Sequence, residues 1–465
     1  MEFQVKPRVT AQGTYTDNEN QSATNKSGDV IAEVTPGISI ATKGVRTNAN
    51  LDYALRKQES FTRDIDQLSH QVQGNGDIAL VKNYVNFFGT GNLSQRRNQV
   101  NRSILSDESL EIDDVANVGA ASAGLTINNH VKRYFDGNFR YVFNTTKSNS
   151  TTFADSNSHN VTASLKNGRT FNRLRWGGDA RYDELDTDDR ELQKIAEVTG
   201  KLGYSITKLS GFDFSAGYES NPQYSTVNRD AESKGYIATA SAYWQSPQQI
   251  VFSALYGQRA FGETYEIKGA WESSTSTIDI GYGRQATGDS LSLQLQQQIG
   301  YALITAGYNE TLSDYSYSNR VNLPQSQNNT PLPLTTITET GTFVTRRASS
   351  SLSFTGVKNI LTFTADYETR DFVESGTDSR TYRAGIFLEN KISTLARLQL
   401  NADAVDANDP AISAVGLYTS VRLSYTHTIQ KVFIARISAQ QWELSPDSGK
   451  KILVNTLSAS LSASF

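Results

Sequence analysis

The sequence predicts an all-β protein, a transmembrane antiparallel up-and-down β-barrel of about 22 strands, within a range of roughly 18–24. Three observations predict it. Apolar and polar side chains alternate with a period of two over unusually long stretches, aromatic residues are frequent on a polar background, and short connections alternate with long ones.

The alternation is clearest at the two ends of the chain, where apolar or small residues occupy every second position of 3–15 and, apart from Asn455, of 453–465. Strands of soluble proteins run about 5–6 residues, whereas a tilted strand that crosses a bilayer needs about 9–11. No segment shows the interleaved 3.6-residue period of a helix. We therefore expect the apolar rows to face lipid, and the residues predicted to do so are Tyr15, Phe139, Tyr141, Trp176, Tyr218, Trp271, Phe363, Leu457, Leu461 and Phe465.

The composition supports one barrel over residues 1–465. Only 37% of the residues are hydrophobic and the mean hydropathy is −0.47, which would suit a disordered chain. The 22 Tyr and 20 Phe argue against disorder and suit a barrel with a wet inside and an apolar outside. No run approaches 18 apolar residues, and the net charge of −4 is spread without blocks, so neither a transmembrane helix nor a nucleic-acid partner is expected.

The connections predict an orientation. Short turns such as Lys43-Gly44 and 81–83 alternate with longer polar stretches such as 95–114 and 220–233. Short periplasmic turns and long external loops are typical of outer-membrane barrels. An even strand number places both chain ends on the periplasmic side. Residues 286–343, with a Gln-rich run, are interpreted as the longest external loop, which either folds into the lumen as a gate or lies on the surface.

Closure follows from the membrane. A soluble β-helix or propeller would show a repeat of about 20–50 residues, and none is found. An open sheet would expose its edges, whereas in lipid every backbone N–H and C=O must be paired, which strands achieve only by closing.

The polar rows predict the lumen wall. They mix both signs of charge, which favours cross-strand ion pairs that stiffen a hydrated wall with no strong net field. Such a wall suits a weakly bound hydrated polymer better than a hydrophobic ligand, because Phe and Leu are expected on the other face. The predicted pore-lining residues are Lys6, Arg8, Asp52, Arg56, Asp136, Arg140, Arg175, Asp179, Arg181, Asp183, Glu266, Lys268, Glu272, Asp366, Glu368, Arg383, Arg397, Asp403, Arg422 and Arg436.

No motif points to catalysis. Cys is absent, and the four histidines have no partner at metal-ligand spacing. The glycine pairs at 74–76 and 89–91 lack the strand-to-helix context of a phosphate loop. We therefore expect no enzyme activity, no metal and no cofactor.

Several segments resemble a family of outer-membrane β-barrel proteins encoded with exopolysaccharide and PEP-CTERM/exosortase gene clusters. The resemblance implies a barrel and a polysaccharide-export neighbourhood, and it extends to barrels that partner periplasmic polysaccharide-export lipoproteins. The residues that carry it are Pro7-Arg8-Val9, 14–18, 35–39, Leu51-Asp52-Tyr53, Ser69-His70-Gln71, Gly76, Tyr256-Gly257, Arg259, Phe261-Gly262, Tyr265 and 346–349.

From these features we predict a passive outer-membrane pore for exopolysaccharide export. Its expected partners are membrane lipid, lipopolysaccharide, the polysaccharide and a periplasmic polysaccharide-export protein. The alternatives are a general diffusion porin, a sheath around a periplasmic partner such as an electron carrier, and a structural anchor with a plugged lumen. No signal peptide is visible, so Met1 is interpreted as a start codon that replaces a removed leader.

Overall fold

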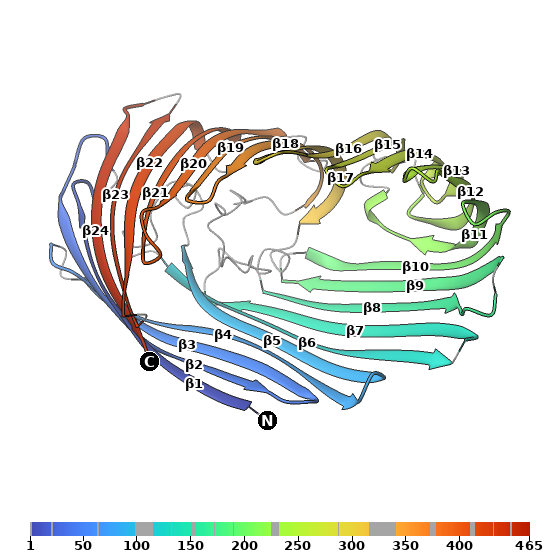
Figure 1. Ribbon diagram of the computed structural model, residues 1–465, viewed down its shortest axis with the longest axis horizontal. Helices are drawn as coiled ribbons and strands as arrows, with labels where there is room; N and C mark the ends of the chain where they lie inside the picture. The colour runs from blue at the N-terminus through green and yellow to red at the C-terminus, as the bar shows by residue number, and fades with distance from the viewer. Residues whose placement is uncertain are drawn as a thin grey trace.

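The computed structural model is one closed sheet of 24 antiparallel strands, in which each strand pairs with its sequence neighbours and β1 pairs with β24. Figure 1 shows the strands wrapping around a lumen, with the two chain ends side by side. The fold prediction is confirmed, with a strand count slightly above the expected value.

The structure describes residues 2–19, 22–62, 65–97, 115–131, 133–149, 155–171, 173–188, 190–224, 232–286, 288–315, 341–372, 378–409, 414–430, 432–446 and 449–465. No helix within these ranges is long and apolar enough to cross a membrane. The strands are β1 (Glu2–Thr16), β2 (Asp29–Lys43), β3 (Thr47–Ser60), β4 (Ile65–Val81), β5 (Val85–Arg97), β6 (Val115–Val131), β7 (Phe135–Ser148), β8 (Ser156–Asn167), β9 (Leu174–Thr187), β10 (Arg190–Ser205), β11 (Ser210–Ser220), β12 (Lys234–Gln245), β13 (Ile250–Arg259), β14 (Gly262–Glu272), β15 (Ser276–Gln285), β16 (Gly288–Ile299), β17 (Ala302–Tyr315), β18 (Gly341–Thr355), β19 (Asn359–Phe372), β20 (Asp378–Lys391), β21 (Ala396–Asp409), β22 (Ala414–Ile429), β23 (Phe433–Pro446) and β24 (Ile452–Ser464).

The pairing register keeps like residues together around the barrel. At the closing seam Ala11 lies opposite Leu461 and Thr10 lies opposite Ser462, whose hydroxyls are 3.0 Å apart. A shift of one residue would move every apolar side chain to the wrong face, so the two-residue period fixes the register wherever lipid covers one face.

The inner face is identified by side chains that meet across an intervening strand. Arg8 on β1 contacts Asp52 on β3, with β2 between them. Such contacts form on the concave face of a closed sheet, where side chains converge, and not on the convex face, where they spread apart.

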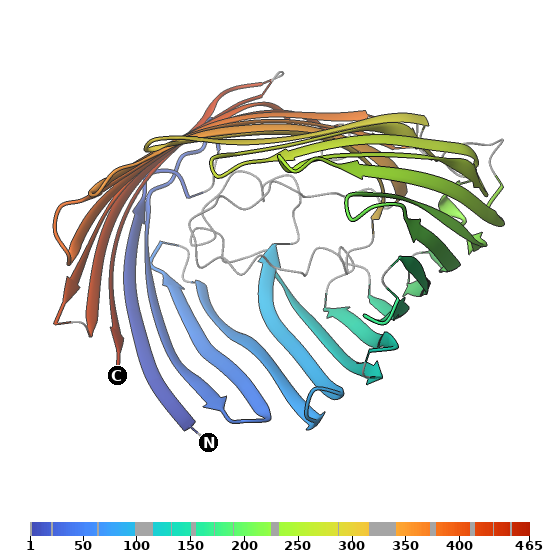
Figure 2. The same cartoon turned by 45° about the vertical axis from the view of Figure 1, so that its right-hand side comes forward.

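One end of the barrel carries the termini and tight turns. Residues Asn83, Gln249 and Gln430 adopt positive φ in three of these turns, which lets the chain reverse within a few residues. Figure 2 shows both termini at this end. Since short turns are periplasmic in such barrels, this end is the periplasmic one.

The segment 286–343, predicted as one long loop, is built differently. It contains β16 and β17, which form a hairpin, and residues 316–340 lie outside the described residues. The Gln-rich run belongs to β16, where Leu291, Leu293 and Leu295 alternate with Ser292, Gln294 and Gln296. The glutamines obscured a regular strand period.

Candidate functional site: the lumen wall

Two arginines lie along the inner wall across a glycine of the neighbouring strand. Arg8 crosses Gly37 to reach Asp52, and a Cβ on Gly37 would come within 2.9 Å of the Arg8 Nε. The absence of a side chain lets the guanidinium lie against the sheet, which leaves the lumen clear.

The second arginine repeats this arrangement on other strands. Arg175 crosses Gly203 and bonds Asp213 at 2.8 Å, and a Cβ on Gly203 would lie 1.9 Å from the Asp213 Oδ1. Arg140, opposite Thr126, lies over the ring of Phe88, 4.8 Å from its centroid, and a Cβ on Gly124 would come within 2.4 Å of that ring.

Arg175 makes further contacts besides its ion pair with Asp213. Its Nη1 donates to the Ser205 hydroxyl at 2.8 Å and to the hydroxyl of Tyr243, and its guanidinium lies 4.7 Å from the Tyr243 ring centroid. The charge is therefore fixed near the periplasmic end of the wall between β9 and β12 and is not free to meet a solute.

Most of the predicted pore-lining residues take part in similar contacts. Those with a recorded charged or aromatic neighbour are Arg8 with Asp52, Arg56 with Glu33, Asp136 with His130, Arg140 with Phe88, Arg175 with Asp213, Asp179 with Lys201, Arg181 with Asp183, Glu266 with Lys268, Asp366 with Arg347, Glu368 with Arg370, and Arg383 with Asp403. Partners such as Glu33, Lys201, Asp213 and Arg347 were not among the predicted site residues, because pairing across strands depends on register.

One ion pair that the sequence did not single out is deeply buried. Arg259, at the external end of β13, donates through Nε to both carboxylate oxygens of Glu219 at 3.1 Å and through Nη2 to Glu197 at 3.2 Å. Glu219 is 2% exposed and also accepts the Ala260 amide at 2.8 Å. This cluster locks β10, β11 and β13 together at the mouth.

The wall from β20 to β23 differs from these regions because three of its cations lie close together. Lys391 lies opposite Arg397, and Arg397 lies one strand from Arg436, with Thr426 between them. All three cations are exposed. Within the described part of the chain none of the three forms an ion pair; Arg436 donates only to the Thr426 hydroxyl, at 3.3 Å.

An apolar cluster faces the lumen at the external end, contrary to the expectation of a wholly polar wall. Trp442 is 2% exposed, and its ring lies 6.1 Å from that of Tyr418. No hydrogen-bond partner reaches the Trp442 Nε1 within the described structure. The cluster consists of Ile31, Tyr418, Trp442, Leu444, Ile452 and Val454.

A smaller apolar pair lies on the same face, where the rings of Phe343 and Phe372 are 5.3 Å apart and both are buried. The sequence contains the signal for both clusters, since Trp442 and Phe343 fall in the polar phase of their strands. They were missed because isolated exceptions to a period do not reveal a cluster until the register brings them together.

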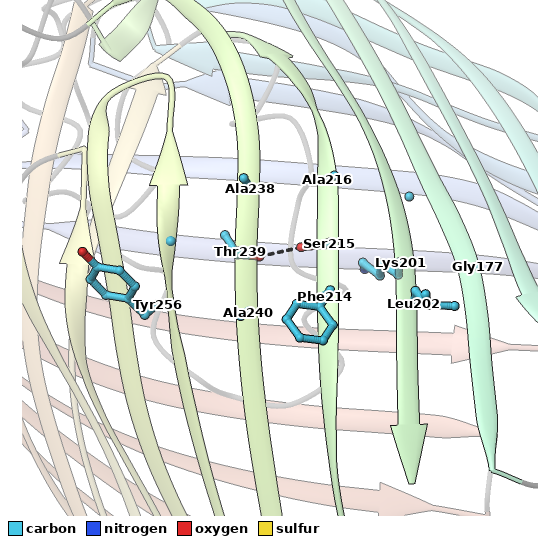
Figure 3. Close-up of a pocket in the computed structure, with 12 residues that line it drawn as sticks. Gly177, Lys201, Leu202, Phe214, Ser215, Ala216, Ala238, Thr239, Ala240 and Tyr256 are labelled. Atoms are coloured by element: carbon cyan, nitrogen blue, oxygen red, sulfur yellow. Dashed lines mark hydrogen bonds between the residues drawn. The ribbon is translucent and has the colours of Figure 1, made fainter.

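Small residues of the outer row on β10, β11 and β12 lie beside a groove. Gly200, Ala216 and Ala238 lie opposite one another on β10, β11 and β12, beside Leu202 and Phe214. They line a groove of about 770 Å³ with mainly apolar walls, shown in Figure 3. The lining also includes Lys201, Ser215 and Thr239 of the inner row, and we assign no solute to this groove.

No group of three or more acidic or histidine side chains in the described ranges is placed to hold a metal ion. Among the described residues Lys6 and Glu272 form no ion pair, and Arg422 donates to the Gln440 side chain at 2.9 Å. The predicted lipid-facing residues all lie on the face opposite the converging side chains, as the register of Tyr15 with Leu457 illustrates.

Comparisons with known proteins place this fold. No family model and no curated protein matches the chain. Solved barrels match it over nearly its full length. The ferric enterobactin receptor of Pseudomonas aeruginosa, in a mutant form, has a TM-score of 0.53 at 7% identity, with 99% of this chain and 80% of that chain covered.

Two further structures agree with it. The siderophore receptor PirA from Acinetobacter baumannii has a TM-score of 0.52 at 9% identity, covering 99% of this chain and 80% of that one. The ferric-catecholate import receptor Fiu from E. coli K12 has a TM-score of 0.52 at 7% identity, covering 98% and 81%. The chain is thus an integral β-barrel of the bacterial outer membrane.

The same comparison corrects the functional prediction. The barrels similar in fold are siderophore and ferric-chelate receptors, so the prediction of a passive exopolysaccharide export pore is wrong, and the alternative of a diffusion porin is not supported either. The two-residue period specifies a hydrated wall but carries no information on the direction of transport. The argument for a polymer also assumed that no apolar surface faces the lumen, and the Trp442 cluster removes that assumption.

Proposed function

We propose that this barrel takes up a small organic metal chelate of the ferric siderophore class across the outer membrane. The similarity in fold to the ferric enterobactin receptor and to Fiu supports the class of transporter. The proposal is one of transport, with no catalytic step.

The Trp442 cluster is the observation that carries the proposal. Ligand sites for organic molecules combine apolar and aromatic walls with a few placed polar groups. Here a buried aromatic cluster faces the lumen at the external end, and the Trp442 indole N–H is left without a partner in the described structure. The partly exposed members of the cluster, Tyr418, Leu444 and Ile452, offer an aromatic and apolar surface that suits a chelate whose ligand arms are aromatic.

The test uses iron uptake and tryptophan fluorescence. A strain without the gene is expected to take up less radiolabelled iron from ferric enterobactin or another ferric chelate under iron limitation. In the purified barrel, that chelate should quench tryptophan emission, and the Trp442→Phe variant should lose most of this quenching.

The matched control is Trp271→Phe, since Trp271 lies on the outer row. It should leave the quenching unchanged. Uptake of every ferric chelate at the wild-type rate in the deletion strain, together with no quenching in the purified protein, would refute the proposal.

A further inference from the structure

The short connections at the periplasmic end of the barrel carry charge of one sign. The described residues of its short connections contain Lys and Arg but neither Asp nor Glu. By contrast, the described residues of the connections at the other end include Asp17, Glu19, Asp155 and Asp188. The cations in the periplasmic connections are Arg46, Lys82, Arg133, Arg169, Arg173, Lys208 and Lys358.

The inner rim at the same end carries both signs of charge, with Asp136 and Glu272 among its acids, but from β20 to β23 it adds exposed cations. Lys391 is the last residue of β20 and Arg397 is the second residue of β21, so both lie at the periplasmic edge of the wall. Arg436 is the fourth residue of β23.

We propose that this end of the barrel docks a separate periplasmic protein through an acidic surface. We call Lys391, Arg397 and Arg436 the rim cations. They face the lumen, where phospholipid headgroups do not reach, so lipid accounts for the turn cations but not for the rim cations. This inference does not depend on the substrate proposed above.

Other occupants fit less well. The acidic residues that the structure describes in the longer connections, such as Asp17, Glu19 and Asp155, lie at the opposite end of the barrel. A second copy in the same membrane has the same orientation, so its acidic loops also lie on the far side. We therefore take the occupant to be a different, acidic polypeptide in the periplasm. Complementary charge of this kind speeds the encounter of two proteins and sets the register of their complex.

The test measures binding of a fluorescein-labelled decaglutamate peptide to the barrel in phosphatidylcholine nanodiscs. The wild-type protein should bind it at low salt, with affinity that falls as salt screens the charges. The triple variant K391Q/R397Q/R436Q should bind at least tenfold more weakly, while its heat-dependent gel mobility shows that the barrel is folded.

The matched control removes the same number of cations at the external end, as K147Q/K450Q/K451Q, and should bind as the wild type does. Equal affinity of both triple variants would overturn the proposal. A tenfold loss for the wild type in phosphatidylglycerol nanodiscs would also overturn it, because the cations would then be occupied by lipid headgroups.

Discussion

Two stretches of the lumen wall have the same two-residue period but differ in whether their cationic side chains form ion pairs. From β9 to β13, Arg175, Arg181, Lys201 and Arg259 each contact a carboxylate. From β20 to β23, the rim cations contact none within the described residues. The first stretch, which we call the paired wall, is neutralised internally. The second, the open wall, keeps charge available for another molecule.

The difference shows that a polar inner row is compatible with two roles. Ion pairs between strands hold the paired wall in register, and glycines such as Gly203 let long side chains lie against it. On the open wall Arg397 lies between Lys391 and Thr426, and Arg436 lies between Thr426 and Ser460, so no carboxylate directly opposite neutralises either cation. Stability should therefore depend on charge in the first region and binding in the second.

The largest effect is expected from Glu219→Ala on the paired wall. The change leaves Arg259 without its closest carboxylate, and removing one member of a buried pair costs about 3–5 kcal/mol. Urea unfolding followed by gel mobility measures the loss. The control Asp179→Ala breaks the exposed pair with Lys201 and should cost less than about 1 kcal/mol. Equal losses would show that burial does not distinguish the two pairs.

Leu423→Arg on the open wall should have the next largest effect. Leu423 lies on the outer row beside Arg422, near the middle of β22, and an arginine facing lipid there costs about 2–4 kcal/mol. The same unfolding measurement applies. Ser420→Arg puts the charge on the inner row opposite Asp403 and should be mild. A mild effect of both changes would contradict the assignment of the two faces.

The sites of these two changes show which features of the structure the sequence could predict and which it could not. Leu423 and Arg422 show a period that is local, so the barrel and its strand faces follow from neighbouring residues. The contact of Glu219 with Arg259 joins residues two strands apart, and no local pattern contains it. Trp442 and Val454 likewise become a cluster only through the register of β23 with β24.

Gly203→Ala tests whether the paired wall needs its glycines, with a smaller effect. Alanine in place of a strand glycine normally stabilises by about 0.5–1 kcal/mol. Here the new Cβ would displace the Asp213 carboxylate and weaken its contact with Arg175, so a net loss of about 1 kcal/mol is expected. In the Asp213→Ala background the same change should stabilise, because the obstacle is gone.

Gly13→Ala is the control for that cycle, since nothing lies within 4 Å of its Cβ position. It should be neutral or stabilising on unfolding in urea. A loss of stability in Gly203→Ala that persists without Asp213 would mean that the backbone, and not the crossing arginine, requires glycine there.

The smallest effect is expected outside both walls, where the external connection after β7 holds Asp155. Lys147 donates to its carboxylate at 2.8 Å and the Ser148 amide at 2.9 Å, and the hydrogen bond from Lys147 chiefly lowers the pKa of Asp155. A lowered pKa means that this contact is complete above the ordinary value of about 3.9 and is lost as the pH falls below it. The Ser148 amide resonance should therefore titrate with a midpoint below that value, and the Asp155→Asn variant should show no such titration. A midpoint at or above the ordinary value would show that Lys147 does not hold the carboxylate, and that paired charge matters only within the barrel wall.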